Sequence, residues 1–159
     1  MVGQLGARPA ECPICREGQP LDVIGELSAL WITAPSTTPL PGYLCLVAKR
    51  HVREPFELPG SERGQFWADI DTVAKAVSDH LRPSKINYEI HGNTLEHLHL
   101  HLYPRSPGDR FEGRPIDGTD SASRSMPDLD RLRHLVSSIA PKVDTAAVAP
   151  ATDEPREEG

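Results

Sequence analysis

Three histidines, His97, His99 and His101, are separated from one another by single leucines. Successive side chains of a β-strand point to opposite faces, so a strand here places the imidazoles on one face and the leucines on the other. A helix would scatter both sets, and the alternation therefore predicts a strand. Imidazoles about 6.5–7 Å apart along one face can bind a metal, transfer a proton or attack an electrophile near neutral pH. A surface strand that is merely rich in histidine, and a metal site made of all three rings, are the alternatives.

Cys12 and Cys15 form a Cys-x-x-Cys pair near the start of the chain. Thiolates of this spacing, joined by imidazoles, suit a structural zinc ion, but the pair alone is also compatible with redox activity or with no function. The chain has three cysteines, an odd number that does not suggest a disulfide framework. We therefore expect a reducing, cytoplasmic location.

The elements that must position these residues follow from hydrophobic periodicity. Short apolar runs bounded by turn residues predict strands over Leu27–Thr33 and Tyr43–Ala48, with a loop rich in Pro and Thr between them. Apolar residues at helical spacing predict a long helix from near Ser61 to Pro83. Further strands are expected over Ile86–Ile90 and from about Leu95 to Tyr103.

The C-terminal third of the chain has a different composition. A loop rich in Gly, Pro and Asp extends to about Asp120, and apolar residues between Leu129 and Ile139 predict a last, short amphipathic helix. Residues 141–159 are mainly Ala, Pro, Asp and Glu without apolar periodicity, which predicts a disordered acidic tail. Residues 1–10 also lack periodicity and are expected to be a loose leader.

The bulk properties restrict the function. A chain of 159 residues is long enough for one domain with a hydrophobic core. No apolar stretch has the roughly 18 residues of a membrane span, and the N-terminus lacks the pattern of a signal peptide. The net charge of -6, without a basic stripe, argues against nucleic-acid binding. A small phosphorylated substrate needs only a few local donors and remains compatible.

The segment from His97 to Arg105 resembles the signature of the histidine triad (HIT) family, in which three histidines alternate with hydrophobic residues. The resemblance extends to Asn87–Thr94, to Gly42–His51 and to Cys12, and covers roughly residues 11–117. It implies an α+β, HIT-like fold over residues 11–140: an antiparallel sheet of about five strands, one long helix and a short C-terminal helix. It also implies a homodimer with one nucleotide site per subunit.

The resemblance assigns roles to single residues. His99 matches the nucleophile, whose ring nitrogen forms a nucleotidyl-histidine intermediate; a neutral imidazole can attack near pH 7 without losing a proton first. His101 matches the residue beside the phosphate and the leaving group. Asn93 and Thr94 match positions that contact phosphate oxygens. Family members often carry Gln where Asn93 stands, and an Asn in this place is equally typical of a turn.

The cysteine pair also gains a role from the resemblance. Cys12, Cys15, His51 and His97 resemble the zinc site of one branch of the family, with His97 as a ligand rather than a catalyst. A closed set of two thiolates and two imidazoles suits a structural ion. We expect zinc to join the N-terminal cysteines to the catalytic strand, and we expect no organic cofactor.

The function implied is hydrolysis of a nucleoside phosphate derivative, a phosphoanhydride or a phosphoramidate, through an adduct on His99. His101 favours hydrolysis over transfer, because nucleotidyltransferase relatives tend to have glutamine there. A nucleotidyltransferase or phosphorylase, and a nucleotide-binding regulator without turnover, are the alternatives. Pro35 stands near the position where many relatives hold the ribose, so base preference and leaving group remain open.

Overall fold

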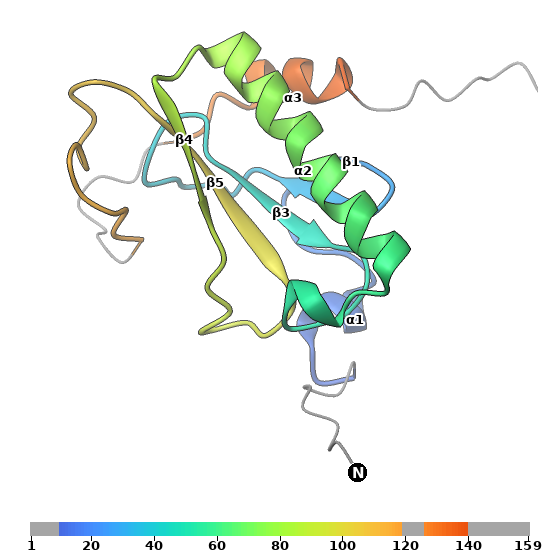
Figure 1. Ribbon diagram of the computed structural model, residues 1–159. Helices are drawn as coiled ribbons and strands as arrows, with labels where there is room; N and C mark the ends of the chain where they lie inside the picture. Colours follow the sequence, from blue (N-terminus) through green and yellow to red (C-terminus); the bar gives the residue numbers. More distant parts are fainter. Residues whose placement is uncertain (1–9, 119–125, 140–159) are drawn as a thin grey trace, which may run out of the picture.

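The computed structural model describes residues 10–118 and 126–139 (Figure 1). The predicted tail over 141–159, and the predicted leader apart from Ala10, lie outside the described residues. Within the described ranges, no helix is both long enough and apolar enough to cross a membrane. The cytoplasmic location stays a prediction.

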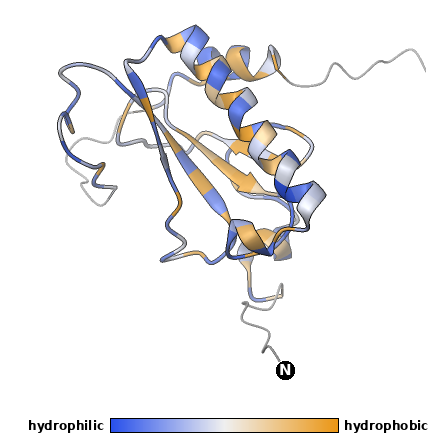
Figure 2. Cartoon of the chain, viewed as in Figure 1, coloured by the Kyte–Doolittle hydropathy of each residue, from blue (hydrophilic) through white to orange (hydrophobic). Residues whose placement is uncertain are grey.

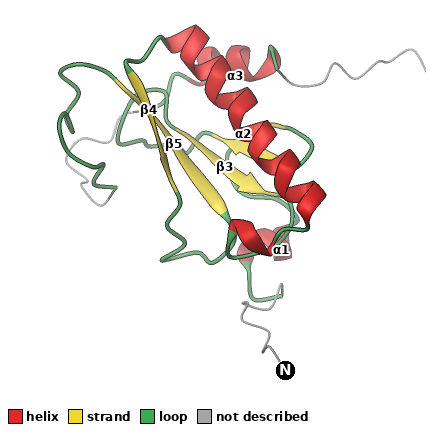
Figure 3. Cartoon of the chain, in the orientation of Figure 1, coloured by secondary structure: helices red, strands yellow, loops and turns green. Residues whose placement is uncertain are grey.

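Five antiparallel strands form one sheet in the order β1-β2-β3-β5-β4 (Figure 3). Their bounds are Val23–Glu26 for β1, Leu30–Thr33 for β2, Leu44–Ala48 for β3, Lys85–Glu89 for β4 and His99–Arg105 for β5. The central strand, β3, pairs with β5 so that Val47 lies opposite His99 and Cys45 opposite His101. The expected α+β fold with a five-stranded antiparallel sheet is confirmed.

The long helix α2, Gly60–Leu81, lies across one face of the sheet (Figure 1). Arg82 ends it in the left-handed conformation, and Pro83 follows. The short helix α3, Leu129–Ser137, packs against α2 and β1. Two smaller helical turns, α1 over Pro13–Glu17 and η1 over Pro55–Glu57, complete the described elements. Both predicted helices are therefore present.

The sheet is covered on both faces. On the α2 side, the leucines that alternate with the histidines join a core that includes Phe66 and Ile70. On the opposite side, α1 and two loops contribute to a second apolar cluster built around Tyr43, Tyr103 and Phe111. All five residues of β3 are buried, and hydrophilic and hydrophobic residues alternate along β5 (Figure 2). The histidine face of β5 is thus the face opposite α2.

Two boundaries differ from the predictions. The run Leu27–Thr33 is not one strand: Leu27 N–H donates to Leu30 O at 2.9 Å, and the Asp69 carboxylate on α2 accepts from Ala29 N–H at 2.7 Å. These bonds make a turn between β1 and β2. Residues before His99 lie outside β5, although Leu98 N–H still donates to Val52 O at 2.7 Å.

Candidate functional site

The three alternating histidines separate into two groups. His97, with only 1% of its surface exposed, points into a cluster with the two N-terminal cysteines. His99 and His101 are half-buried, at the start of β5. The leucines between them lie in the core beneath α2, as the alternation predicts. One sequence pattern therefore supplies two chemically different sites.

The first site is the cluster of Cys12, Cys15, His51 and His97, whose ligand atoms all lie within 4.8 Å of one another. The two histidine Nδ1 atoms are 3.2 Å apart, and three sulfur-to-nitrogen distances are 3.3, 3.4 and 3.8 Å. Ligand distances of zinc in a tetrahedron would separate two nitrogens by about 3.3 Å and a nitrogen from a sulfur by about 3.5 Å. The geometry suits a tetrahedral metal ion.

The surroundings of this cluster orient its ligands. His97 donates its Nε2–H to Ala48 O at 2.7 Å, which leaves Nδ1 with a lone pair directed at the cluster. Burial, with smaller contributions from Cys12, raises the pKa of the Cys15 thiol to about 11. Burial also lowers the pKa of His97. Both shifts favour the uncharged forms of Cys15 and His97 in the absence of a cation, whereas a bound metal ion would deprotonate the thiols.

The second site begins with His99. Its Nδ1 lies 2.7 Å from the carbonyl oxygen of His97, so Nδ1–H donates and Nε2 keeps the lone pair. The His99 ring is 4.9 Å from that of His101, edge-on at 83°. An imidazole fixed in this tautomer has one nucleophilic nitrogen, and it is the atom farther from the backbone.

His101 sits deeper, between aromatic rings. It stacks with Tyr43 and Tyr103, and its Nδ1 lies 2.7 Å from the Tyr43 hydroxyl oxygen. Burial, followed by the charges of His99 and His91, lowers the pKa of His101 to about 4. His101 is therefore neutral at pH 7 and acts there as a hydrogen-bonding group rather than as a cation.

A fourth histidine, His91, belongs to the same group and was not among the predicted site residues. Its ring centroid is 5.5 Å from that of His101, and its Nε2 lies 2.9 Å from a carboxylate oxygen of Glu89. Glu89, the last residue of β4, is the register partner of His101. The sequence did offer a signal: Glu89 and His91 are two titratable residues at i and i+2, at the end of β4, the strand that pairs with β5. We call His99, His101 and His91 the imidazole row.

Asn93 and Thr94 are exposed, in the bend between β4 and β5 that follows Gly92. Gly92 has a φ of +71°, a conformation that permits this bend. No hydrogen bond joins either side chain to the imidazole row in the described part of the chain. Their role as phosphate contacts stays a prediction.

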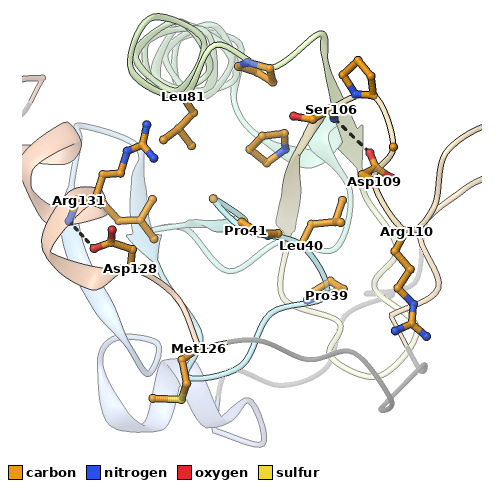
Figure 4. Close-up of a pocket in the computed structure, with 16 residues that line it drawn as sticks. Pro39, Leu40, Pro41, Leu81, Ser106, Asp109, Arg110, Met126, Asp128 and Arg131 are labelled. Carbon is orange, nitrogen blue, oxygen red and sulfur yellow. Dashed lines mark hydrogen bonds between the residues drawn. The ribbon is translucent and has the colours of Figure 1, made fainter.

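A cavity of about 670 Å³ lies elsewhere on the molecule (Figure 4). It is formed where the loop before β3 meets the C-terminal end of α2 and the start of α3, with Pro41, Leu81 and Arg131 among its lining residues. None of the predicted site residues lines it. The candidate chemistry thus belongs to the histidine face of the sheet and not to this cavity.

Comparison with known proteins identifies the family. The model of the HIT domain matches residues 17–108, which include His51, His91 and all three alternating histidines. The chain belongs to the HIT family. The match starts beyond Cys12 and Cys15, so the evidence that these two cysteines belong to the metal cluster comes from the structure.

Solved structures share this fold. A histidine triad protein from Bradyrhizobium japonicum aligns with a TM-score of 0.63 and 24% identity, over 74% of this chain and 86% of that one. A zinc-bound HIT protein from Mycobacterium smegmatis has a TM-score of 0.60 and 20% identity, over 82% and 96% of the two chains. At these identities the likeness shows the fold alone.

One curated relative carries an activity in its name, the bis(5'-adenosyl)-triphosphatase of Dictyostelium discoideum. It is 29% identical over 75 residues, which are 44% of this chain and 50% of the relative. The chain thus spans about half the length of the curated relative that it matches.

Proposed function

We propose that this HIT protein hydrolyses nucleoside phosphate derivatives through a covalent adduct on His99. The observation that carries the proposal is the tautomer of His99: its Nδ1–H donates to the carbonyl of His97, so the lone pair of Nε2 is free to attack phosphorus. The HIT fold and the triphosphatase activity named for the Dictyostelium relative support the reaction class.

Two displacements complete the reaction. In the first, the lone pair of Nε2 forms a bond to the α-phosphorus, and the bond to the bridging oxygen or nitrogen breaks with its electron pair going to the leaving group. The positive charge that develops on the ring is stabilised by the Nδ1–H bond to the His97 carbonyl. In the second, water attacks the phosphorus and gives up a proton to solvent, the P–N bond breaks with its electron pair returning to Nε2, and the nucleoside monophosphate leaves. Asn93 and Thr94 are proposed to contact the phosphate oxygens from the bend.

The metal cluster has a separate role in this proposal. Zinc held by Cys12, Cys15, His51 and His97 would have all four coordination positions filled by protein, as structural sites do. It would join α1 to the segment that precedes β5 and hold the carbonyl of His97 where His99 needs it. No organic cofactor is required by the two displacements.

Trapping the adduct tests the mechanism. Wild-type protein is mixed rapidly with diadenosine triphosphate labelled in its α-phosphates, then denatured in base, where a phosphoramidate survives. We expect label on His99 after peptide mapping, and none on protein carrying His99→Ala. Label on His97 or His101 would contradict the mechanism. Turnover in ¹⁸O water separates hydrolysis from a phosphorylase, because only hydrolysis places ¹⁸O in the monophosphate, and binding without turnover would indicate a regulator.

We further propose that the protein forms a homodimer through β4. Among the strands of the described residues, β4 pairs with β5 alone and lies at an edge of the sheet. Tyr88 and Ile90, at its end, expose 47% and 37% of their surfaces. Sedimentation velocity should give a dimer for the wild type and a monomer for Ile90→Arg. A monomeric wild type would refute this assembly without affecting the chemistry.

A further inference from the structure

His91 is the outermost member of the imidazole row. Its side chain is 51% exposed, whereas His99 and His101 are half-buried. The two inner rings already use one nitrogen each within the protein: Nδ1 of His99 bonds the His97 carbonyl, and Nδ1 of His101 bonds the Tyr43 hydroxyl. His91 is thus the exposed ring beside His101, accessible to a part of the substrate that extends beyond the two inner rings.

Glu89 fixes the orientation of His91. The carboxylate accepts from Nε2–H at 2.9 Å, which leaves Nδ1 as the ring atom available to a ligand. Glu89 is itself held by β4, opposite His101 in the register, and its side chain is only 20% exposed. The His91 ring is therefore held at a defined place beside His101 by an element of the sheet.

Leaving groups differ in the charge that they would bring close to His91. Cleavage of a phosphoanhydride releases a phosphate that carries negative charge, whereas cleavage of a phosphoramidate releases an amine. His101 stays neutral because of its burial, so it does not supply a positive charge to the departing group. An imidazole that donates to a carboxylate from one nitrogen and to a phosphate from the other is a cation, and such bonds are stronger than neutral ones.

We propose that His91, oriented by Glu89, binds the phosphate of the leaving group and makes this site selective for phosphoanhydrides over phosphoramidates. This inference rests on the proposed function, in which His99 attacks the α-phosphorus. In it His91 contacts the substrate directly, and Glu89 is a positioning residue that acts through His91.

The kinetic test compares two substrates that share the same adenylyl group. We expect His91→Ala to lower kcat/KM for diadenosine triphosphate by about 10- to 100-fold, and to change that for adenosine 5'-phosphoramidate less than threefold. Glu89→Gln keeps an acceptor for Nε2–H without its charge and should give a smaller loss with the same substrate dependence. His134→Ala, an exposed histidine on α3, is the matched control and should change neither. Equal losses on both substrates, or no loss, would overturn the inference.

A binding measurement separates this inference from the proposed function. Calorimetry with AMP and with α,β-methylene ADP needs no turnover. Wild type should bind the diphosphate at least about tenfold more tightly, and His91→Ala should bind the two about equally. An unchanged preference in His91→Ala, or none in wild type, would overturn the inference. If the preference holds while wild type turns over neither substrate, the hydrolase proposal fails and the role of His91 in binding stands.

Discussion

The metal cluster and the imidazole row are both built from histidines, and they share the segment between His97 and His101. In the cluster, four donor atoms point at one another across less than 4.8 Å, and His97 is almost fully buried. In the row, the ring centroids of neighbouring histidines lie 4.9 and 5.5 Å apart, and His91 at its end is exposed. The cluster has the dimensions of a site for one ion, whereas the row is where we propose that a substrate binds.

The carbonyl of His97 connects the two. The side chain of His97 belongs to the cluster, and its carbonyl oxygen sets the tautomer of His99. In our proposal, a metal ion that holds this backbone would therefore orient a nucleophile that it does not contact. This division predicts that mutations in the row lower the rate of turnover, whereas mutations in the cluster lower the stability of the fold.

The largest effect is expected from His99→Ala. We expect turnover to fall by at least about a thousandfold, because His97 directs its ring nitrogens to the metal cluster and to Ala48 O, and our mechanism assigns attack to no other ring. The melting temperature should change little, since His99 is half-buried and contributes one hydrogen bond. Steady-state rates and thermal unfolding measure both quantities. Retention of more than a few per cent of the rate would refute His99 as the nucleophile.

Cys12→Ala should produce the opposite result. Loss of a buried ligand removes the metal, and we expect the free energy of unfolding to fall by about 3 kcal/mol or more, while protein that stays folded still forms the adduct. Metal analysis, denaturant unfolding and adduct trapping measure the three effects. Cys45→Ala is the matched control, because this cysteine is equally buried and lies outside the cluster. The Cys45→Ala protein should keep the metal. If a chelator left the stability of the wild type unchanged, the metal site would be refuted.

A smaller effect is expected from His101 as the pH falls. Its pKa is about 4 in the folded protein, against an ordinary value of 6.5. Above pH 6.5 the ring is neutral in both states and contributes nothing to the pH dependence; between 6.5 and 4 only the unfolded chain takes up the proton, so stability is lost. Denaturant unfolding at pH 7.5 and 5 should therefore show a larger loss for wild type than for His101→Gln. Equal losses would place the His101 pKa near its ordinary value.

The smallest effect is expected from truncation after Ala140. The tail has too little apolar surface to offset the entropy of ordering it, so neither half of the site should depend on it. Melting temperature and turnover of the shortened chain should match those of the full one. A clear fall in either would indicate that the tail docks on the domain or its dimer partner.

Most of the fold could be predicted, because its larger elements bury long periodic apolar faces. The α2 periodicity and the leucine alternation of β5 are local patterns that burial enforces. The short elements α1 and β1 were missed because neither contains an apolar run: α1 buries only Ile14, and no residue of β1 is fully buried. The turn after Leu27 depends on Asp69, more than forty residues ahead on α2, which no local pattern indicates.

The candidate site, like the fold, could be predicted only in part from the sequence. By itself the sequence determined the strand and its leucine face, because these follow from residue identity and period. Through the resemblance it also indicated the four residues of the metal cluster, which the structure brings together. Tertiary structure decided which side chains meet: Cys12 lies 85 residues from His97 in the chain, and only the fold brings them to 3.4 Å. It also added His91 to the row through the pairing of Glu89 with His101. The hydrogen-bond partners of a histidine decide its role, and they come from neighbouring strands and from segments distant in the sequence. The residues next to it in the sequence therefore do not predict that role.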